Sequence, residues 1–172
     1  MASTGPLIVI TGFMGTGKTT VGRLLARRLG LDFADMDLCI EAEEGAPVAA
    51  IFRERGEAYF RARERHWCER LSKRDSLVVS TGGGALVDAR NLACFSLAFV
   101  VCLEAEPEEL LARLAAQEGR PLLEGPDPRE RVARLMAERR EAYARIAWHL
   151  DTSGKTADQV ADEIMAVLGA QG

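Results

Sequence analysis

The stretch GFMGTGKTT, residues 12–20, decides what kind of fold this sequence can adopt. It matches the pattern G-x-x-x-x-G-K-[ST], whose glycines let the backbone curl until several N–H groups point at one anion. A short apolar run precedes it at residues 7–10, and apolar residues at helical spacing follow it over residues 21–29. A buried strand, a glycine loop and a helix in this order place the positive end of the helix dipole at that anion.

The loop therefore predicts a nucleotide-binding site with bound Mg²⁺. Lys18 would reach the β- and γ-phosphates, and the Thr19 hydroxyl would ligate the metal. A plain glycine-rich turn is the alternative, but a chance match in a chain of this size has odds of roughly one per cent or less. The residues expected to contact the nucleotide are Gly12, Gly15, Thr16, Gly17, Lys18, Thr19 and Thr20.

Strand and helix signals alternate along the rest of the chain. Expected strands lie at residues 7–10, 33–35, 77–79 and 97–103, with a last one near Trp148 and Leu150. Expected helices cover residues 21–29, 37–44, 47–55 and 57–73, then start after Pro107, after residue 129 and at the capping box of Thr156 and Gln159. This alternation indicates one domain, residues 1–172, with a three-layer α/β/α fold around a five-stranded, mostly parallel sheet.

Composition excludes several function classes. The net charge is −4 and the pI is near 5.3, which argues against a protein that binds nucleic acid or an anionic membrane. The basic run at residues 61–74 is interleaved with Glu64 and Glu69, so it is expected to be a solvated helix face. The N-terminus lacks a signal-peptide pattern and no apolar run could span a bilayer, so we expect a cytoplasmic protein.

The cysteines and histidines give little support to a zinc site. The chain has two histidines, His66 and His149, and its cysteines never form C-x-x-C. Isolated cysteines among apolar neighbours are usually small buried hydrophobic residues. The four cysteines are Cys39, Cys68, Cys94 and Cys102.

Two further segments follow strands and point to a second ligand. FADMD, residues 33–37, ends a strand, and alternation would put Asp35 and Asp37 on one side of an extended segment. One carboxylate could serve a metal and the other a substrate hydroxyl, although Asp37 could instead cap the next helix. STGGG, residues 80–84, would let the backbone approach a ligand closely, the alternative being a flexible turn.

The order and spacing of these motifs resemble shikimate kinase over roughly residues 7–168. GFMGTGKTTVGRLLA resembles the phosphate loop and first helix of that family, and FADMD resembles its D-x-D. GEAYFRARE at residues 56–64 and STGGG are similar to its G-E-x-x-F-R-x-x-E and glycine triplet. RPLLEGPDP resembles its lid, and RREAY at residues 139–143 resembles the segment that follows the lid.

The resemblance implies roles for particular residues. Arg61 and Arg139 would grip the carboxylate of shikimate, a planar-fork contact that suits arginine. Asp37 would bond the 3-hydroxyl and either accept its proton or aim it, and Asp35 would help Thr19 to hold Mg²⁺. The shikimate ring would lie against Gly82, Gly83 and Gly84. Lys18 and Arg120 would contact the phosphoryl group during its transfer, and Arg113 would approach the adenine side of the nucleotide.

The resemblance also implies the organisation of the domain: a mobile lid at approximately residues 114–128 and a substrate-binding helical region at approximately residues 37–64. The implied activity is ATP-dependent phosphorylation of shikimate at its 3-hydroxyl, in aromatic amino-acid biosynthesis, by a monomer whose partners are the small molecules ATP and shikimate. One alternative is a related kinase acting on gluconate or a nucleoside monophosphate. Another is a catalytically idle nucleotide-binding regulator, which would predict that Lys18, Asp37 or Arg120 is missing, whereas all three are present.

Overall fold

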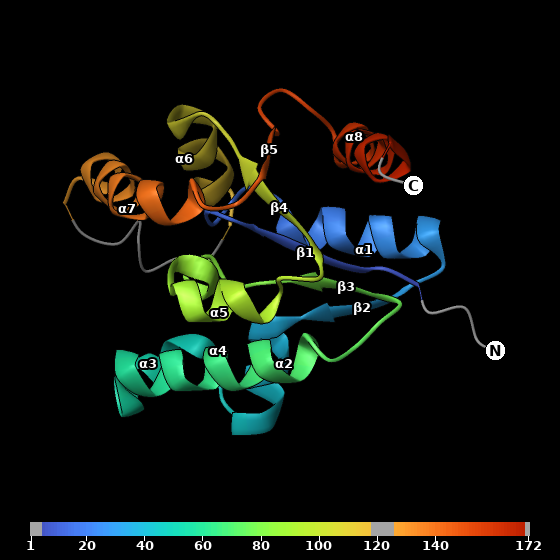
Figure 1. Ribbon diagram of the computed structural model, residues 1–172. Coiled ribbons are helices and arrows are strands. Elements are labelled where there is room, and N and C mark those ends of the chain that lie inside the picture. Colours follow the sequence, from blue (N-terminus) through green and yellow to red (C-terminus); the bar gives the residue numbers. More distant parts are fainter. Residues whose placement is uncertain (1–4, 118–125, 171–172) are drawn as a thin grey trace.

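A five-stranded parallel sheet forms the centre of the computed structural model, which describes residues 5–117 and 126–170. The strand order is β2-β3-β1-β4-β5, so the strand that leads into the phosphate loop lies in the middle (Figure 1). The strands are β1 (Leu7–Gly12), β2 (Asp32–Asp35), β3 (Leu77–Ser80), β4 (Phe99–Glu104) and β5 (Trp148–Asp151). All four neighbouring pairs are parallel, so the carboxyl ends of the strands share one edge.

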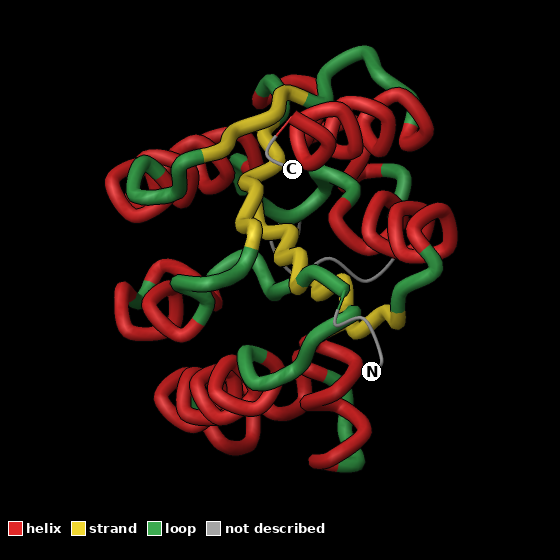
Figure 2. The backbone as a smooth tube through the Cα atoms, turned by 45° about the vertical axis from the view of Figure 1, so that its right-hand side comes forward, coloured by secondary structure: helices red, strands yellow, loops and turns green. Residues whose placement is uncertain are grey.

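Helices cover both faces of the sheet (Figure 2). Their bounds are α1 (Lys18–Leu29), α2 (Met36–Glu44), α3 (Val48–Arg55), α4 (Glu57–Leu71), α5 (Ala89–Cys94), α6 (Pro107–Ala115), α7 (Pro128–Tyr143) and α8 (Ala157–Ala170), with a 3-10 turn η1 at Ala85–Val87. The three-layer α/β/α architecture predicted from the sequence is confirmed.

The two faces of the sheet bury alternate residues of the same strands, as the two-residue period of a strand requires. Val9 and Val79 pack with side chains of α2, α3 and α4. Ile8 and Ile10 pack on the other face with α1 and α8. A smaller apolar cluster around Phe13 joins α6 and α7 next to the phosphate loop.

The structure corrects three local expectations. β2 ends at Asp35 and α2 begins at Met36, so Asp37 lies in the first turn of a helix and not in an extended segment. β4 begins at Phe99, and Leu97, expected inside a buried strand, is fully exposed. The helix cap is Asp35, whose Oδ1 accepts a hydrogen bond from the Leu38 amide at 3.2 Å; the alternative that Asp37 serves as the cap is therefore wrong.

Most of the expected lid, residues 118–125 of 114–128, lies outside the described residues, and so does Arg120. Within the described ranges, no helix combines the length and the apolar character needed to cross a membrane.

Candidate functional site

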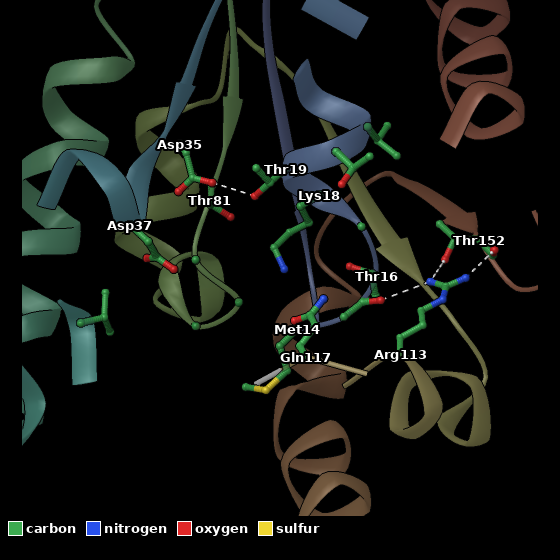
Figure 3. Close-up of a pocket in the computed structure, with 18 of the residues that line it drawn as sticks. Met14, Thr16, Lys18, Thr19, Asp35, Asp37, Thr81, Arg113, Gln117 and Thr152 are labelled. Atoms are coloured by element: carbon green, nitrogen blue, oxygen red, sulfur yellow. Dashed lines mark hydrogen bonds between the residues drawn. The ribbon is translucent and has the colours of Figure 1, made fainter. Parts of the chain in front are cut away.

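A cavity of about 790 Å³ lies at the edge of the sheet where the strands end. In Figure 3, Asp35 and Asp37 lie on one side of it and Arg113 with Thr152 on the other, with Lys18 between them. Residues predicted from the sequence that line this one cavity are Gly15, Thr16, Gly17, Lys18, Thr19, Thr20, Asp35, Asp37, Arg61, Gly82, Gly83, Gly84, Arg113 and Arg139. The fold therefore brings together the predicted nucleotide and acceptor residues.

The phosphate loop takes its shape from its glycines. Gly15 and Gly17 have φ of 81° and 90°, in the region that favours glycine, and Gly17 is the residue from which α1 starts. The Thr16 hydroxyl donates to the Phe13 carbonyl at 2.7 Å, and Lys18 Nζ donates to the same oxygen at 3.0 Å. The lysine thus bends back over the loop, at the N-terminus of a helix, where an anion is favoured.

Gly12, the first glycine of the motif, packs against a neighbouring strand. It does not line the cavity. It pairs with Leu103 of β4, and a Cβ at this position would lie 2.2 Å from the Leu103 carbonyl oxygen. The first glycine of the motif is therefore required by close packing of two strands, which leaves the other glycines to face a ligand.

Lys18, the one basic residue of the loop, has an unusual electrostatic environment. Burial lowers the pKa of its ammonium group from 10.5 to about 8, while Asp37 opposes this shift and Arg139 adds to it. A desolvated cation beside a backbone anion site gains most from a negatively charged ligand, because the ligand supplies the counter-charge that the protein does not.

Thr19 and Asp35 provide the oxygen ligands that Mg²⁺ prefers. The Thr19 hydroxyl donates to Asp35 Oδ2 at 2.7 Å, joining the start of α1 to the end of β2. A hydroxyl and a carboxylate next to a triphosphate site fit a magnesium ion, which binds proteins through one or two such groups and fills its other positions with water and phosphate oxygens.

Asp37 carries a charge that the protein leaves partly unsatisfied. Its Oδ1 is buried without a hydrogen-bond partner among the described residues. Burial, followed by the nearby Asp35 carboxylate, raises the pKa of Asp37 from 3.8 to about 6, against the opposing effect of Lys18. A Cβ on Gly82 would lie 2.8 Å from Oδ1, so this glycine leaves the carboxylate open to a ligand.

Arg61 is held by a carboxylate that the site prediction does not include. Its Nη1 lies 2.6 Å from Oε2 of Glu64, whose side chain is only 1% exposed. The guanidinium packs beside Phe52 and Phe60, with Cζ 5.9 and 5.8 Å from the two ring centroids. A Cβ on Gly84 would lie 2.5 Å from Arg61 Nη1, so glycine is needed here to admit the guanidinium.

Arg139 approaches the same cavity from α7. Its Nη1 is buried and has no hydrogen-bond partner within the part of the chain that the structure describes. Its Cζ lies 5.3 Å from the Phe13 ring centroid, and a Cβ on Gly83 would lie 3.1 Å from Nη1. The Tyr143 hydroxyl donates to the Gly83 carbonyl and ties α7 to the glycine triplet.

Arg113 forms the opposite wall and is extensively bonded to the protein. Its Nη1 donates to the Gly15 carbonyl at 3.2 Å and to the Thr152 hydroxyl at 3.0 Å. Its Nη2 donates to the Thr152 carbonyl at 3.0 Å and lies 2.5 Å from Glu109 Oε1. Arg113 thus links the phosphate loop to the segment after β5.

The site prediction does not include several residues of the cavity. Glu64 has one available signal, because it closes the quoted G-E-x-x-F-R-x-x-E motif. Glu109 lies one helical turn before Arg113, a spacing that predicts a paired side chain. Thr81 has a signal of the same kind, because it lies within the quoted STGGG, whereas Thr152 gives none, because its position depends on how the strands pair.

Comparison with known proteins agrees with this geometry. The family model described as shikimate kinase matches residues 14–169. A shikimate kinase from Symbiobacterium thermophilum is 45% identical, with 96% of this chain and 97% of that protein covered. One from Geobacter metallireducens is 43% identical, with 94% of this chain and 90% of that protein covered.

Solved structures also resemble this chain. Shikimate kinase from Acinetobacter baumannii in complex with shikimate superposes with a TM-score of 0.91 at 36% identity, covering 98% of this chain and 95% of that one. A gluconokinase from Sinorhizobium meliloti superposes with a TM-score of 0.61 at 19% identity, covering 98% and 93% of the two chains, which is a likeness of fold alone. On these matches, and on the motifs that line the cavity, the chain belongs to the shikimate kinase family.

Proposed function

We propose that this chain transfers the γ-phosphoryl group of ATP to the 3-hydroxyl of shikimate, giving shikimate 3-phosphate and ADP. One observation carries the proposal. A buried carboxylate oxygen of Asp37 and a buried guanidinium nitrogen of Arg139, both beside the phosphate loop, lack partners among the described residues. An acceptor with a hydroxyl at one end and a carboxylate at the other would satisfy both groups at once, which offsets the cost of burying them.

The nucleotide occupies the phosphate-loop side in this proposal. Lys18 releases the Phe13 carbonyl and contacts the β- and γ-phosphates. Thr19 and Asp35 hold Mg²⁺, which when bound neutralises charge on the phosphate oxygens. Gly15, Gly17 and Thr20 line the path of the phosphates, and Arg113 bounds the adenine side.

The acceptor occupies the side formed by α2, α4, α7 and the glycine triplet. Its carboxylate lies between Arg61 and Arg139, where charge-assisted bonds are strongest. Its ring lies against Gly82, Gly83 and Gly84, whose missing side chains leave room for it. This arrangement assigns the helical region of residues 37–64 to substrate binding.

The chemistry requires little beyond positioning and charge stabilisation. Asp37, whose pKa burial raises to about 6, lies where the reacting hydroxyl is expected and can accept its proton as the oxygen–phosphorus bond forms. Lys18 stabilises the charge on the phosphoryl group as it leaves ADP. A matching role for Arg120 in the lid stays a prediction from the sequence.

The test is ADP release with Mg²⁺-ATP, comparing shikimate, gluconate, AMP and CMP with no acceptor. We expect rapid turnover with shikimate alone, and loss of that turnover in Asp37→Asn with ATP binding retained. Turnover only with another acceptor would refute the roles of Arg61 and Arg139. Binding of ATP without turnover on any acceptor would indicate an idle regulator.

A further inference from the structure

A second cluster of reactive side chains lies on β4 and β5, outside the lining of the catalytic cavity. Cys102 on β4 is in register with His149 on β5, and Glu104 follows Cys102 on the same face of its strand. Val101 and Leu103, which alternate with Cys102 and Glu104 along β4, pack with α1 and α8, so the cluster lies on the opposite face. None of the three cluster residues lines the cavity.

The potential ligand atoms of the cluster are close together. One atom from each residue, the Cys102 sulfur, a Glu104 carboxylate oxygen and a His149 ring nitrogen, lie within 4.8 Å of one another. Cys102 is buried, whereas the side chains of His149 and Glu104 are 30% and 52% exposed. The cluster therefore combines a sheltered sulfur with two groups that a dissolved ion can reach.

The contacts of His149 determine which of its ring nitrogens faces the cluster. Its Nε2 lies 2.9 Å from the Ile146 carbonyl oxygen, which can only accept, so Nε2 carries a hydrogen. Its Nδ1 lies 2.6 Å from Glu104 Oε1. With the hydrogen on Nε2, Nδ1 is the ring nitrogen that faces the cluster and whose lone pair a metal ion can use.

We propose that Cys102, Glu104 and His149 form a binding site for Zn²⁺. Thiolate, imidazole and carboxylate are the three ligand types that zinc accepts together, and a fourth, tetrahedral position would be filled by water. Binding forms a sulfur–zinc bond and releases the Cys102 thiol proton to the solvent. The Ile146 carbonyl fixes the tautomer that leaves Nδ1 for the metal, as partners of zinc-bound histidines commonly do.

The geometry needs only small adjustments. Ligand atoms around one tetrahedral zinc stand roughly 3.3–3.8 Å apart, given bonds of about 2.0–2.3 Å. The distance between His149 Nδ1 and Glu104 Oε1, now 2.6 Å, must increase, and the largest distances between ligand atoms, which are at most 4.8 Å, must decrease. The exposed Glu104 side chain can make most of this change by rotating about its own bonds.

The test is a Co²⁺ titration of the nucleotide-free protein, followed by displacement with Zn²⁺. Cobalt reports a thiolate ligand through an ultraviolet charge-transfer band and a tetrahedral site through visible d–d bands. We expect both signals to saturate at one equivalent and to vanish as Zn²⁺ is added. Omitting nucleotide keeps the Thr19 and Asp35 site from contributing.

Variants identify the ligands. Cys102→Ser should abolish the charge-transfer band, and His149→Gln and Glu104→Gln should weaken Zn²⁺ binding by at least about tenfold, since loss even of a group merely bonded to a ligand costs about 10–100-fold. His149 and Glu104 are exposed enough to be replaced without loss of folding, which circular dichroism would verify.

Matched controls come from the same chain. His66→Gln removes the only other histidine. Cys39→Ser removes a half-buried thiol whose pKa is raised by burial and by Asp35, so it tests a thiol beside the proposed Mg²⁺ ligands. Both controls should bind Co²⁺ like the original protein. Absence of a charge-transfer band, or its survival in Cys102→Ser, would overturn the proposal.

Discussion

The two sides of the catalytic cavity are built in different ways. The nucleotide side is centred on a contiguous loop whose shape depends on Gly15 and Gly17 at positive φ and on hydrogen bonds to the Phe13 carbonyl. The acceptor side is assembled from side chains on three separate helices, including Asp37 and Arg139, each with a buried polar atom that no described residue pairs.

This difference shows which part of the site lowers the stability of the ligand-free protein. Backbone N–H groups at a helix start are present in any such loop and remain hydrated until phosphate arrives. Buried charges without partners destabilise the folded protein, because desolvation is not offset until a ligand supplies the missing bonds. Substitutions on the acceptor side should therefore affect both catalysis and stability, in opposite directions.

Asp37→Asn should have the largest effect of any substitution on the acceptor side. We expect kcat for shikimate phosphorylation to fall by about 10²–10⁴-fold, the usual contribution of a positioned acid or base, while ATP affinity stays the same. Steady-state kinetics and equilibrium ATP binding measure the two effects. Asp32→Asn, at a 74% exposed side chain on the same strand-to-helix segment, is the control and should leave both unchanged. A fall in kcat below about tenfold would contradict a role for Asp37 in the chemical step.

The same residue should leave a signature in the pH dependence of stability. Because the pKa of Asp37 is about 6 in the folded protein against 3.8 ordinarily, the folded state keeps a proton that the unfolded state has released. The free energy of unfolding should therefore fall as the pH rises from about 4 to 6, by up to roughly 3 kcal/mol. Denaturant unfolding across this range, compared with Asp37→Asn, isolates the effect. Parallel curves for the two proteins would show that Asp37 has an ordinary pKa.

Arg139→Lys keeps the charge on the acceptor side but removes the planar fork. We expect KM for shikimate to rise about 10–100-fold, the equivalent of about 1.5–3 kcal/mol for charge-assisted bonds, with KM for ATP unchanged. Arg134→Lys is the matched control on α7, because the Arg134 side chain is 67% exposed and outside the cavity. An equal rise in both KM values would mean that Arg139 supports the whole cavity and not the acceptor alone.

How far the sequence can predict the fold depends on how local each signal is. The phosphate loop, the strands of the core and the Thr156 capping box are encoded by adjacent residues, and all three form, with Gln159 accepting from the Thr156 amide at 2.9 Å, although β4 begins at Phe99 and not at Leu97. The expected start of α2 is one residue too late, because the Asp35 side chain caps the helix directly at the end of β2. Alternation alone cannot detect that competition between a strand and a capping side chain.

The candidate site shows the same limit. Motifs identify Asp37, Arg61 and Arg139, but the burial of Glu64 beneath Arg61 emerges only when α4 packs against the sheet. The sequence gives no sign of the cluster of Cys102 and His149, because the register of β4 and β5 brings together residues far apart in the chain. Spacing rules for zinc ligands detect local pairs and miss such cross-strand groups.

The smallest effect is predicted for substitutions at the C-terminal ends of α1 and α2, the helices that begin at the nucleotide side and at the acceptor side of the cavity. α1, which starts at the phosphate loop, is followed by the C-cap Gly30 with φ 66°, and α2, which carries Asp37, is followed by the C-cap Gly45 with φ 67°. A Cβ added at either glycine would meet no atom of the described residues within 4 Å, so only backbone strain would oppose an alanine. Gly30→Ala and Gly45→Ala should each lower the free energy of unfolding by about 1 kcal/mol, because alanine resists the left-handed conformation.

Kinetics of these two variants sharpen the comparison. Both should keep kcat and both KM values, because the side chains that line the cavity stand at the opposite ends of α1 and α2. Gly169→Ala within α8 has open space and an ordinary φ, so it should be neutral or stabilise by about 0.5–1 kcal/mol. If Gly45→Ala raised the KM for shikimate but not the KM for ATP, the position of α2 would also determine how the acceptor binds. The acceptor side would then be more sensitive to a change at the far end of its helix than the phosphate loop is.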